Sequence, residues 1–172
     1  MNYKSKLEDI KVFIFDYDGV ISDGYLYIAN EDIVMRSGNA KDGYAIQYAL
    51  KQGYKVVILS GGKGKSIEAR AKMLGMEDVF ISSANKLETY EKYCKDNNIN
   101  KNSVLYMGDD IPDYDIMLNV GVATCPKDAA QEIKDVADYI SDKNGGQGCV
   151  RDVIEQVLRL HHKWFNENSK EW

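Results

Sequence analysis

Two short acidic segments carry most of the residues that could do chemistry. The first contains Asp16 and Asp18 in the run Asp-Tyr-Asp-Gly, and the second contains Asp109, Asp110 and Asp113. Asp16 and Asp18 are two positions apart, so in an extended chain both carboxylates project to the same side. Clustered carboxylates repel one another and lose hydration, and hard oxygen ligands of this kind suit Mg²⁺. The pattern predicts a magnesium site, provided that the fold brings the two segments together.

A hydroxyl group and a lysine add the groups that a phosphate needs. Ser60 follows an apolar run and precedes Gly61 and Gly62, and Lys86 stands at the start of an amphipathic segment. The hydroxyl and the two glycine N–H groups can donate hydrogen bonds to phosphoryl oxygens, and Lys86 supplies a positive charge. One metal ion, one lysine and several donors match the charge of a phosphoryl group in transfer. These residues therefore predict phosphoryl chemistry.

The elements that must position these residues alternate along the chain. We expect strands at residues 11–15, 55–59, 79–81, 104–107, 122–124 and 138–140, and helices at 43–52, 66–74, 86–97, 114–120, 129–136 and 150–164. This alternation predicts a single α/β domain over residues 1–172, a doubly wound, Rossmann-like parallel sheet with helices on both faces. Ligands bind such sheets at the carboxyl ends of the strands, which is where the acidic segments and Ser60 fall.

A β-hairpin inserted after the first strand is expected at about residues 24–36. Two apolar runs, 25–28 and 33–35, flank a polar turn there. The chain has 12 Tyr against 4 Phe, and Tyr25 and Tyr27 alternate on this hairpin. Tyrosine rings suit an interface that is partly apolar and partly wet. We therefore expect the hairpin to take part in self-association.

The composition is that of an ordinary globular protein and excludes several classes. Of the 172 residues, 44% are hydrophobic and 28% charged, and the net charge is −5. This acidic balance disfavours nucleic acid as a partner, because phosphate backbones need a basic face. No apolar run approaches the roughly 20 residues that span a bilayer, and we expect no secretory leader. Three widely spaced cysteines predict buried reduced thiols in a cytoplasmic protein.

Taken together, the motifs resemble those of the haloacid dehalogenase (HAD) superfamily of phosphatases. Four of them occur in the family's order: Asp-Tyr-Asp-Gly-Val at 16–20, Ser60, Lys86, and Gly-Asp-Asp-Ile-Pro-Asp at 108–113. The chain is most similar to the capless 3-deoxy-D-manno-octulosonate 8-phosphate phosphatase-like branch. That branch has two further motifs, an Asp-Gly pair, here at 42–43, and Gly-Gly-x-Gly-x-x-Arg, here at 145–151. The resemblance covers nearly the whole chain.

The resemblance implies a role for each acidic residue. Asp16 is the nucleophile that forms an aspartyl-phosphate, and Asp18 protonates the leaving alkoxide and then activates water. Mg²⁺ is held by Asp16, the backbone carbonyl of Asp18, and Asp109. Asp110 and Asp113 support the metal from outside its ligand shell. For Asp113 one alternative stays open, because it could simply cap a helix that begins at the next residue.

The resemblance also implies how the substrate is held. Ser60, Gly61 and Lys86 bind the phosphoryl group, whereas Lys41 and Arg151 bind the rest of the substrate. Arg151 follows the Gly-rich segment, in a C-terminal loop and helix at about 145–164 that reaches a neighbouring subunit's active site in this branch. Whether Arg151 acts in its own subunit or across an interface stays open. The branch forms homotetramers through the hairpin, so we expect one here, with neighbouring subunits enclosing the substrate.

The implied activity is Mg²⁺-dependent hydrolysis of a 2-keto-3-deoxy sugar-acid phosphate, a step of lipopolysaccharide or nonulosonate biosynthesis. The substrate is 3-deoxy-D-manno-octulosonate 8-phosphate or a related nine-carbon acid 9-phosphate. Three departures from the branch keep the second substrate open. Ser-Gly-Gly stands at 60–62 where the branch has Thr-Gly-Arg, Lys41 replaces an arginine, and Asp152 replaces a glutamate. Lysine is a point charge and not a bidentate fork. Lys63 or Lys65 could replace the missing guanidinium.

Two other classes share some of these features. A phospho-receiver domain also combines acidic residues, Mg²⁺ and a lysine, but its acidic pair is normally adjacent, and its phospho-accepting aspartate ends the third strand, where this chain has Ser82 and Ser83. The alternative that remains is a non-catalytic HAD-like oligomerisation module associated with a sugar-acid cytidylyltransferase. Fold alone does not exclude it.

Overall fold

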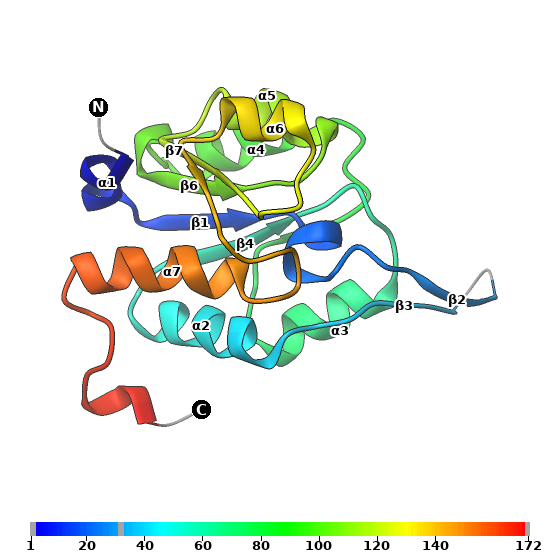
Figure 1. Cartoon of the computed structure of the whole chain (residues 1–172), viewed down its shortest axis with the longest axis horizontal. Coiled ribbons are helices and arrows are strands. Elements are labelled where there is room, and N and C mark those ends of the chain that lie inside the picture. The colour runs from blue at the N-terminus through cyan, green and yellow to red at the C-terminus, as the bar shows by residue number, and fades with distance from the viewer. Residues whose placement is uncertain (1–2, 31–32, 171–172) are drawn as a thin grey trace.

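A six-stranded parallel sheet forms the centre of the computed structural model, which describes residues 3–30 and 33–170 (Figure 1). The strands lie in the order β5-β4-β1-β6-β7-β8, and every neighbouring pair is parallel. Their bounds are β1 Val12–Phe15, β4 Lys55–Leu59, β5 Val79–Phe80, β6 Val104–Met107, β7 Val122–Cys125 and β8 Tyr139–Ile140. The chain winds from β1 to one side and returns to the other side at β6. The carboxyl ends of β1 and β6 therefore flank a topological switch point, where ligands bind in this architecture.

Helices cover both faces of the sheet, which confirms the doubly wound α/β prediction (Figure 1). One face carries α2 Ala40–Lys51, α3 Lys65–Met73 and α7 Cys149–Leu160, and the other carries α4 Lys86–Asp96, α5 Tyr114–Met117 and α6 Gln131–Val136. A short helix, α1 Tyr3–Lys6, precedes β1. Short 3₁₀ or irregular turns occur at Leu7–Asp9, Tyr17–Ile21, Lys101–Ser103, Ile111–Asp113 and Glu167–Lys170.

Two hydrophobic cores, one on each side of the sheet, follow from the alternation of side chains along β1. Phe13 and Phe15 join the core under α2 and α7, whereas Val12 and Ile14 join the core under α4 and α6. All four are buried. Successive side chains of a strand point to opposite faces, so a strand that is apolar throughout must lie between two helical layers. This central position holds the end of β1, with Asp16, in a rigid frame.

The predicted hairpin forms a sheet of its own and extends away from the body (Figure 1). Its strands are β2 Tyr27–Asn30 and β3 Ile33–Met35, which pair antiparallel with Tyr27 opposite Met35. The predicted turn falls partly on residues 31 and 32, which lie outside the described residues. Every residue of β2 is exposed. The hairpin thus buries little of its apolar surface against its own chain.

Several helix bounds differ from the predicted ones, and two of the differences have clear local reasons. Helix α2 begins at Ala40, three residues earlier than predicted. The Asn39 side chain caps it by accepting hydrogen bonds from the N–H groups of Lys41 and Asp42. Helix α7 ends at Leu160 and not at 164. His162 has a left-handed φ of 56°, and the N–H groups of residues 163 and 164 both turn back to the Leu158 carbonyl.

Two expectations from composition can be compared with the structure. Cys94, Cys125 and Cys149 are all buried and unpaired, as predicted. Over residues 3–30 and 33–170, no helix has the length and apolar character needed to cross a bilayer.

Candidate active site

A cavity of about 330 Å³ opens at the carboxyl edge of the sheet. Residues that follow β1, β4 and β6, together with the first residue of α4, line it. The sheet therefore brings together the acidic segments, the Ser-Gly-Gly run and the lysine, as the sequence predicts. Its lining includes Asp16, Asp18, Ser60, Gly61, Lys86, Asp109, Asp110 and Asp113.

The chain turns sharply after Asp16, and a glycine makes the turn possible. The Asp16 carboxylate accepts a hydrogen bond from the N–H of Tyr17 at 2.6 Å. Gly19 has a φ of +86°, and a Cβ built on it would lie 2.0 Å from Oδ2 of Asp109. Any side chain here would be strained and would collide with that carboxylate. Gly19 thus lets the two acidic segments meet.

Lys86 bridges two of the carboxylates. Its Nζ lies 3.0 Å from Oδ2 of Asp16 and 2.6 Å from Oδ1 of Asp113. The lysine is the first residue of α4, whose N-terminus is capped by the Asn85 side chain. Burial alone would lower the pKa of Lys86, but Asp16 and Asp113 together raise it above its ordinary value. The site therefore holds a charged ammonium next to Asp16.

Asp113 is fully buried, and both of its carboxylate oxygens accept hydrogen bonds. Oδ1 accepts from Lys86 and from the Tyr106 hydroxyl at 2.5 Å, and Oδ2 accepts from the N–H groups of Asp109 at 3.0 Å and Asp110 at 3.4 Å. Its side chain makes no capping hydrogen bond to α5, so the helix-cap alternative is wrong. The side chains of Asp110 and Asp113 instead form a capping box at the short turn Ile111–Asp113. Asp113 thus orients the loop that carries Asp109.

The carboxylates fit a divalent cation. Asp16, Asp109 and Asp113 each offer an oxygen within 4.8 Å of the others, and in the described part of the chain the buried Oδ1 of Asp109 has no hydrogen-bond partner. Burial, followed by the charges of Asp16 and Asp113, raises the pKa of Asp109 to about 8. Burial and the Asp113 charge raise the pKa of Asp16 to about 6. A bound cation would relieve this repulsion.

Asp16 and Asp109 are better placed as direct ligands than Asp113, because each oxygen of Asp113 already accepts two hydrogen bonds, whereas each oxygen of Asp16 has one partner. This division agrees with the supporting role expected for Asp113. The backbone carbonyl of Asp18, the third ligand implied by the resemblance, stays a prediction.

Ser60 is buried at the end of β4 and is fixed by its backbone. Its N–H donates to the Phe80 carbonyl, and its carbonyl accepts from the N–H of Ser83. Its Oγ accepts from the N–H of Gly62 at 3.0 Å, so the hydroxyl proton can be donated to a phosphoryl oxygen. The Gly62 N–H, which we expected to face the phosphate, is engaged with Ser60 instead. Gly61 also lines the cavity.

No motif in the sequence identifies the residue that contacts Asp18. Arg36, the first residue after β3, holds the Asp18 carboxylate with two nitrogens, Nε to Oδ1 at 2.7 Å and Nη2 to Oδ2 at 3.1 Å. The Ser22 hydroxyl also donates to Asp18 at 3.3 Å. The one available signal was an arginine directly after an apolar hairpin strand.

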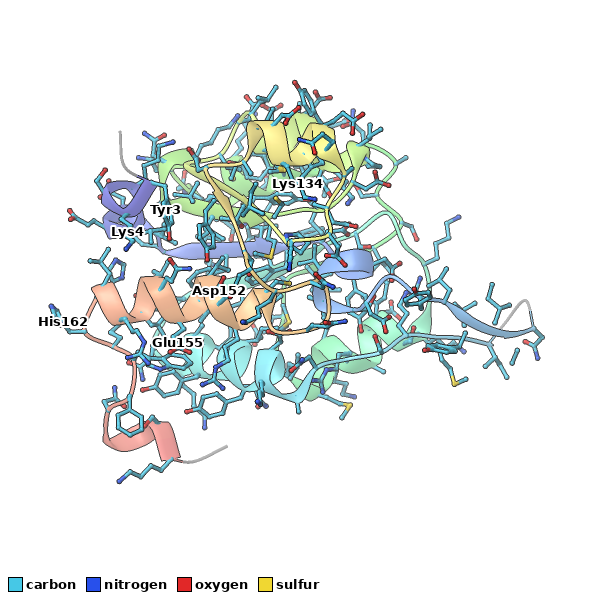
Figure 2. All side chains as sticks on the ribbon, in the orientation of Figure 1. Tyr3, Lys4, Lys134, Asp152, Glu155 and His162 are labelled. Carbon is cyan, nitrogen blue, oxygen red and sulfur yellow. The ribbon has the colours of Figure 1, made fainter. Side chains whose placement is uncertain are left out.

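Lys41 and Arg151 line a different cavity of about 400 Å³, between the start of α2 and α7. The Arg151 guanidinium lies over the rings of Trp164, at 5.3 Å, and Tyr44, at 5.9 Å. Its Nε also donates to Glu155, which Figure 2 labels on α7 beside Asp152. Within one chain, these two cations therefore face a cavity other than the one that Asp16 lines.

The two additional motifs, Asp-Gly and the Gly-rich segment, meet each other and the catalytic loop. The buried Asp42 carboxylate accepts from the N–H groups of Gly148 at 3.1 Å and Arg151 at 2.7 Å, so it caps α7. A Cβ on Gly145 would lie 1.9 Å from the Gly19 carbonyl oxygen, and Gly146 donates to the Val20 carbonyl. The Gly-rich segment thus packs directly under the turn after Asp16.

The comparisons with known proteins agree with this geometry. Residues 65–154 match the model of the haloacid dehalogenase-like hydrolase family. The 3-deoxy-D-manno-octulosonate 8-phosphate phosphatase KdsC of Salmonella typhi is 35% identical over 92% of this chain and 85% of that protein.

Two solved structures are similar over almost the whole chain. The phosphatase of the same name from Yersinia pestis superimposes with a TM-score of 0.91 and 30% identity, covering 94% of this chain and 88% of that one. The one from Moraxella catarrhalis, in complex with a magnesium ion, a phosphate ion and a KDO molecule, gives a TM-score of 0.88 and 29% identity, covering 91% and 90%.

Proposed function

We propose a function from the premise that this chain belongs to the haloacid dehalogenase-like hydrolases. It is a Mg²⁺-dependent phosphatase that hydrolyses the phosphate monoester of a 2-keto-3-deoxy sugar acid, with 3-deoxy-D-manno-octulosonate 8-phosphate as the leading candidate. The observation that carries this proposal is the single cavity lined by Asp16, Asp18, Asp109, Ser60 and Lys86. The names of the relatives support the substrate, and the magnesium and phosphate ions of the Moraxella catarrhalis complex support the cofactor.

The reaction proceeds in two displacements at phosphorus. A carboxylate oxygen of Asp16 attacks, and the bond to the sugar oxygen breaks while Asp18 gives that oxygen its proton. Asp18, now ionised, takes a proton from water, which attacks the phosphorus and breaks the bond to Asp16. Inorganic phosphate and free Asp16 result. Lys86 and the Ser60 hydroxyl hold the transferring phosphoryl oxygens and offset their charge.

Asp16 and Asp109 would hold the metal ion, with Asp113 orienting the Asp109 loop. When bound, Mg²⁺ supplies positive charge that lets an anionic carboxylate approach an anionic phosphate. Lys86 adds to this effect, since its ammonium lies 3.0 Å from Asp16.

The hairpin supports a homotetramer. Its apolar side chains are largely exposed, with Ile28 at 69% and Met35 at 55%, and aliphatic or aromatic surface of this kind marks an interaction site. Within residues 3–30 and 33–170 no lid domain covers the catalytic cavity, so neighbouring subunits would enclose the substrate. Because Lys41 and Arg151 line a separate cavity, we infer that they would bind substrate across this assembly, in a neighbouring subunit's site.

The test is phosphate release, with Mg²⁺ and with a chelator, from a panel of monoesters. The panel contains 3-deoxy-D-manno-octulosonate 8-phosphate, a nine-carbon keto-acid 9-phosphate, hexose phosphates and an aryl phosphate. We expect metal-dependent release that is fastest with the octulosonate ester and is lost in Asp16→Asn. Preference for the nine-carbon ester would correct the substrate. No release from any ester by folded, Mg²⁺-binding protein would favour the non-catalytic oligomerisation module.

A further inference from the structure

We propose that Arg36 is a positioning residue that sets the direction of the Asp18 carboxylate; this inference rests on the proposed phosphatase function. The guanidinium makes a bidentate contact, with Nε 2.7 Å from Oδ1 and Nη2 3.1 Å from Oδ2. The third nitrogen, Nη1, donates to the Ser66 hydroxyl at 3.2 Å. All three nitrogens of the planar group are therefore fixed, and they fix the plane of the carboxylate in turn.

The burial of the two side chains shows that Arg36 is the more firmly held partner of the ion pair. The Arg36 side chain is only 4% exposed, whereas that of Asp18 is 29% exposed and lines the catalytic cavity. A covered guanidinium that lost its carboxylate would be left with an unpaired charge, which is costly. The ion pair therefore fixes the Asp18 carboxylate at the wall of the catalytic cavity, and the oxygen that carries the proton for the leaving group gives up its contact with Arg36.

Gly62 provides the room for this ion pair. A Cβ at position 62 would lie 2.8 Å from Oδ2 of Asp18 and 3.3 Å from Nη2 of Arg36. A side chain at position 62 would therefore crowd the contact between Arg36 and Asp18.

The position of Arg36 in the chain links Asp18 to the hairpin. Arg36 directly follows β3, whose last residue, Met35, is 55% exposed. The chain passes from the extended hairpin into the body at this residue. Arg36 therefore links the base of the hairpin to the acid/base group.

A positioning role makes a specific kinetic prediction. A sugar alkoxide needs a proton from Asp18 to leave, whereas nitrophenolate leaves without one. In single-turnover reactions at saturating substrate, Arg36→Lys and Arg36→Met should slow cleavage of the sugar-acid phosphate by about tenfold or more, within the range of general acid catalysis. Cleavage of 4-nitrophenyl phosphate should slow less than about threefold, since no protonation of that leaving group is required.

Four other outcomes would overturn the assignment. An equal loss with both esters indicates a structural role, and a higher KM for the sugar acid at an unchanged saturated rate indicates substrate binding. Unchanged kinetics with both esters shows that Arg36 is dispensable, while wild-type activity leaves the phosphatase function intact. An inactive wild-type protein would overturn that function and this assignment together.

Two controls keep the result interpretable. Ser66→Ala removes the outer partner of Arg36 but keeps the bidentate contact, so its rates should stay near those of the wild type. In an Asp18→Asn background, Arg36→Met should have little further effect on the sugar-acid ester, because residues that act as a unit are not additive. Arg36→Lys retains the charge and most of the stem, so it also reports if Arg36→Met fails to fold.

Discussion

At the scale of single residues, three carboxyl groups lie so close together that their ionised forms repel one another unless a cation is bound among them. Asp16, Asp109 and Asp113 offer oxygens within 4.8 Å of one another. Lys86 offsets part of this charge, but Asp109 has a buried oxygen without a partner among the described residues. Burial and the remaining repulsion between the carboxylates raise the pKa of Asp16 to about 6 and that of Asp109 to about 8.

These pKa values predict how metal affinity depends on pH. Both lie above the ordinary value of 3.8, so the metal-free folded protein binds more protons than the unfolded chain does between these values. Its free energy of unfolding therefore falls as the pH rises from about 4 to about 8. Because Mg²⁺ must displace the protons, its affinity should rise from pH 6 to pH 8 and level off above.

Isothermal titration calorimetry in two buffers of different ionisation enthalpy measures both the affinity and the proton release. An affinity that stays constant over this range, with no protons released, would show that Asp16 and Asp109 are not the titrating ligands.

The substitution Asp109→Asn separates the effect of the Asp109 charge on stability from its effect on activity. Without metal at pH 8, the variant should be more stable than the wild type, because an amide carries no charge beside Asp16. Its Mg²⁺-dependent activity should fall by about 100-fold or more, since a ligand and its field are lost. Thermal unfolding with a chelator and phosphate release with Mg²⁺ give the two readouts. A variant that is less stable without metal, or fully active with it, contradicts this role.

At the scale of elements, one buried carboxylate joins α2 to α7. Asp42 accepts from the N–H groups of Gly148 and Arg151, and burial raises the pKa of this carboxyl group. Asp42→Ala should lower the free energy of unfolding by about 1–3 kcal/mol, because it leaves two donors without a partner. The exposed neighbour Lys41 is the matched control, and Lys41→Ala should change the stability by less than about 0.5 kcal/mol. Urea denaturation measures both; equal effects would show that the cap contributes nothing.

The strands could be predicted from the sequence because each is an apolar run between turn signals, and a parallel sheet buries such runs on both faces. The meeting of the candidate catalytic residues in one cavity could be predicted because strand ends in this architecture converge. The end of α7 could not, since it depends on the left-handed backbone of His162 and on Trp164 turning back to Leu158. Arg36 was missed for a similar reason. Its contact with Asp18 depends on the path of the chain after the hairpin, which no local pattern encodes.

At the scale of the whole molecule, the hairpin should assemble the protein. Ile28 is 69% exposed, so Ile28→Asp should fold normally but shift a tetramer toward monomers, because a charge would be buried in the interface. Light scattering coupled to size exclusion measures the mass. Leu160→Asp is the control, since it ends α7 at the far side of the body from the hairpin (Figure 1). A monomeric wild type at micromolar concentration, or a tetrameric Ile28→Asp, would contradict assembly through the hairpin.

The covalent intermediate is the most direct test of the whole account. In an Asp18→Asn variant given 4-nitrophenyl phosphate, the phosphoryl group should be transferred to Asp16. The aspartyl-phosphate should then accumulate, because the carboxylate that activates water is missing. Reduction with borohydride and peptide mapping would then find homoserine at position 16, with Mg²⁺ present and not with a chelator or in the Asp16→Asn protein. Phosphate release by the wild type with no trapped product at this position would contradict Asp16 as the nucleophile.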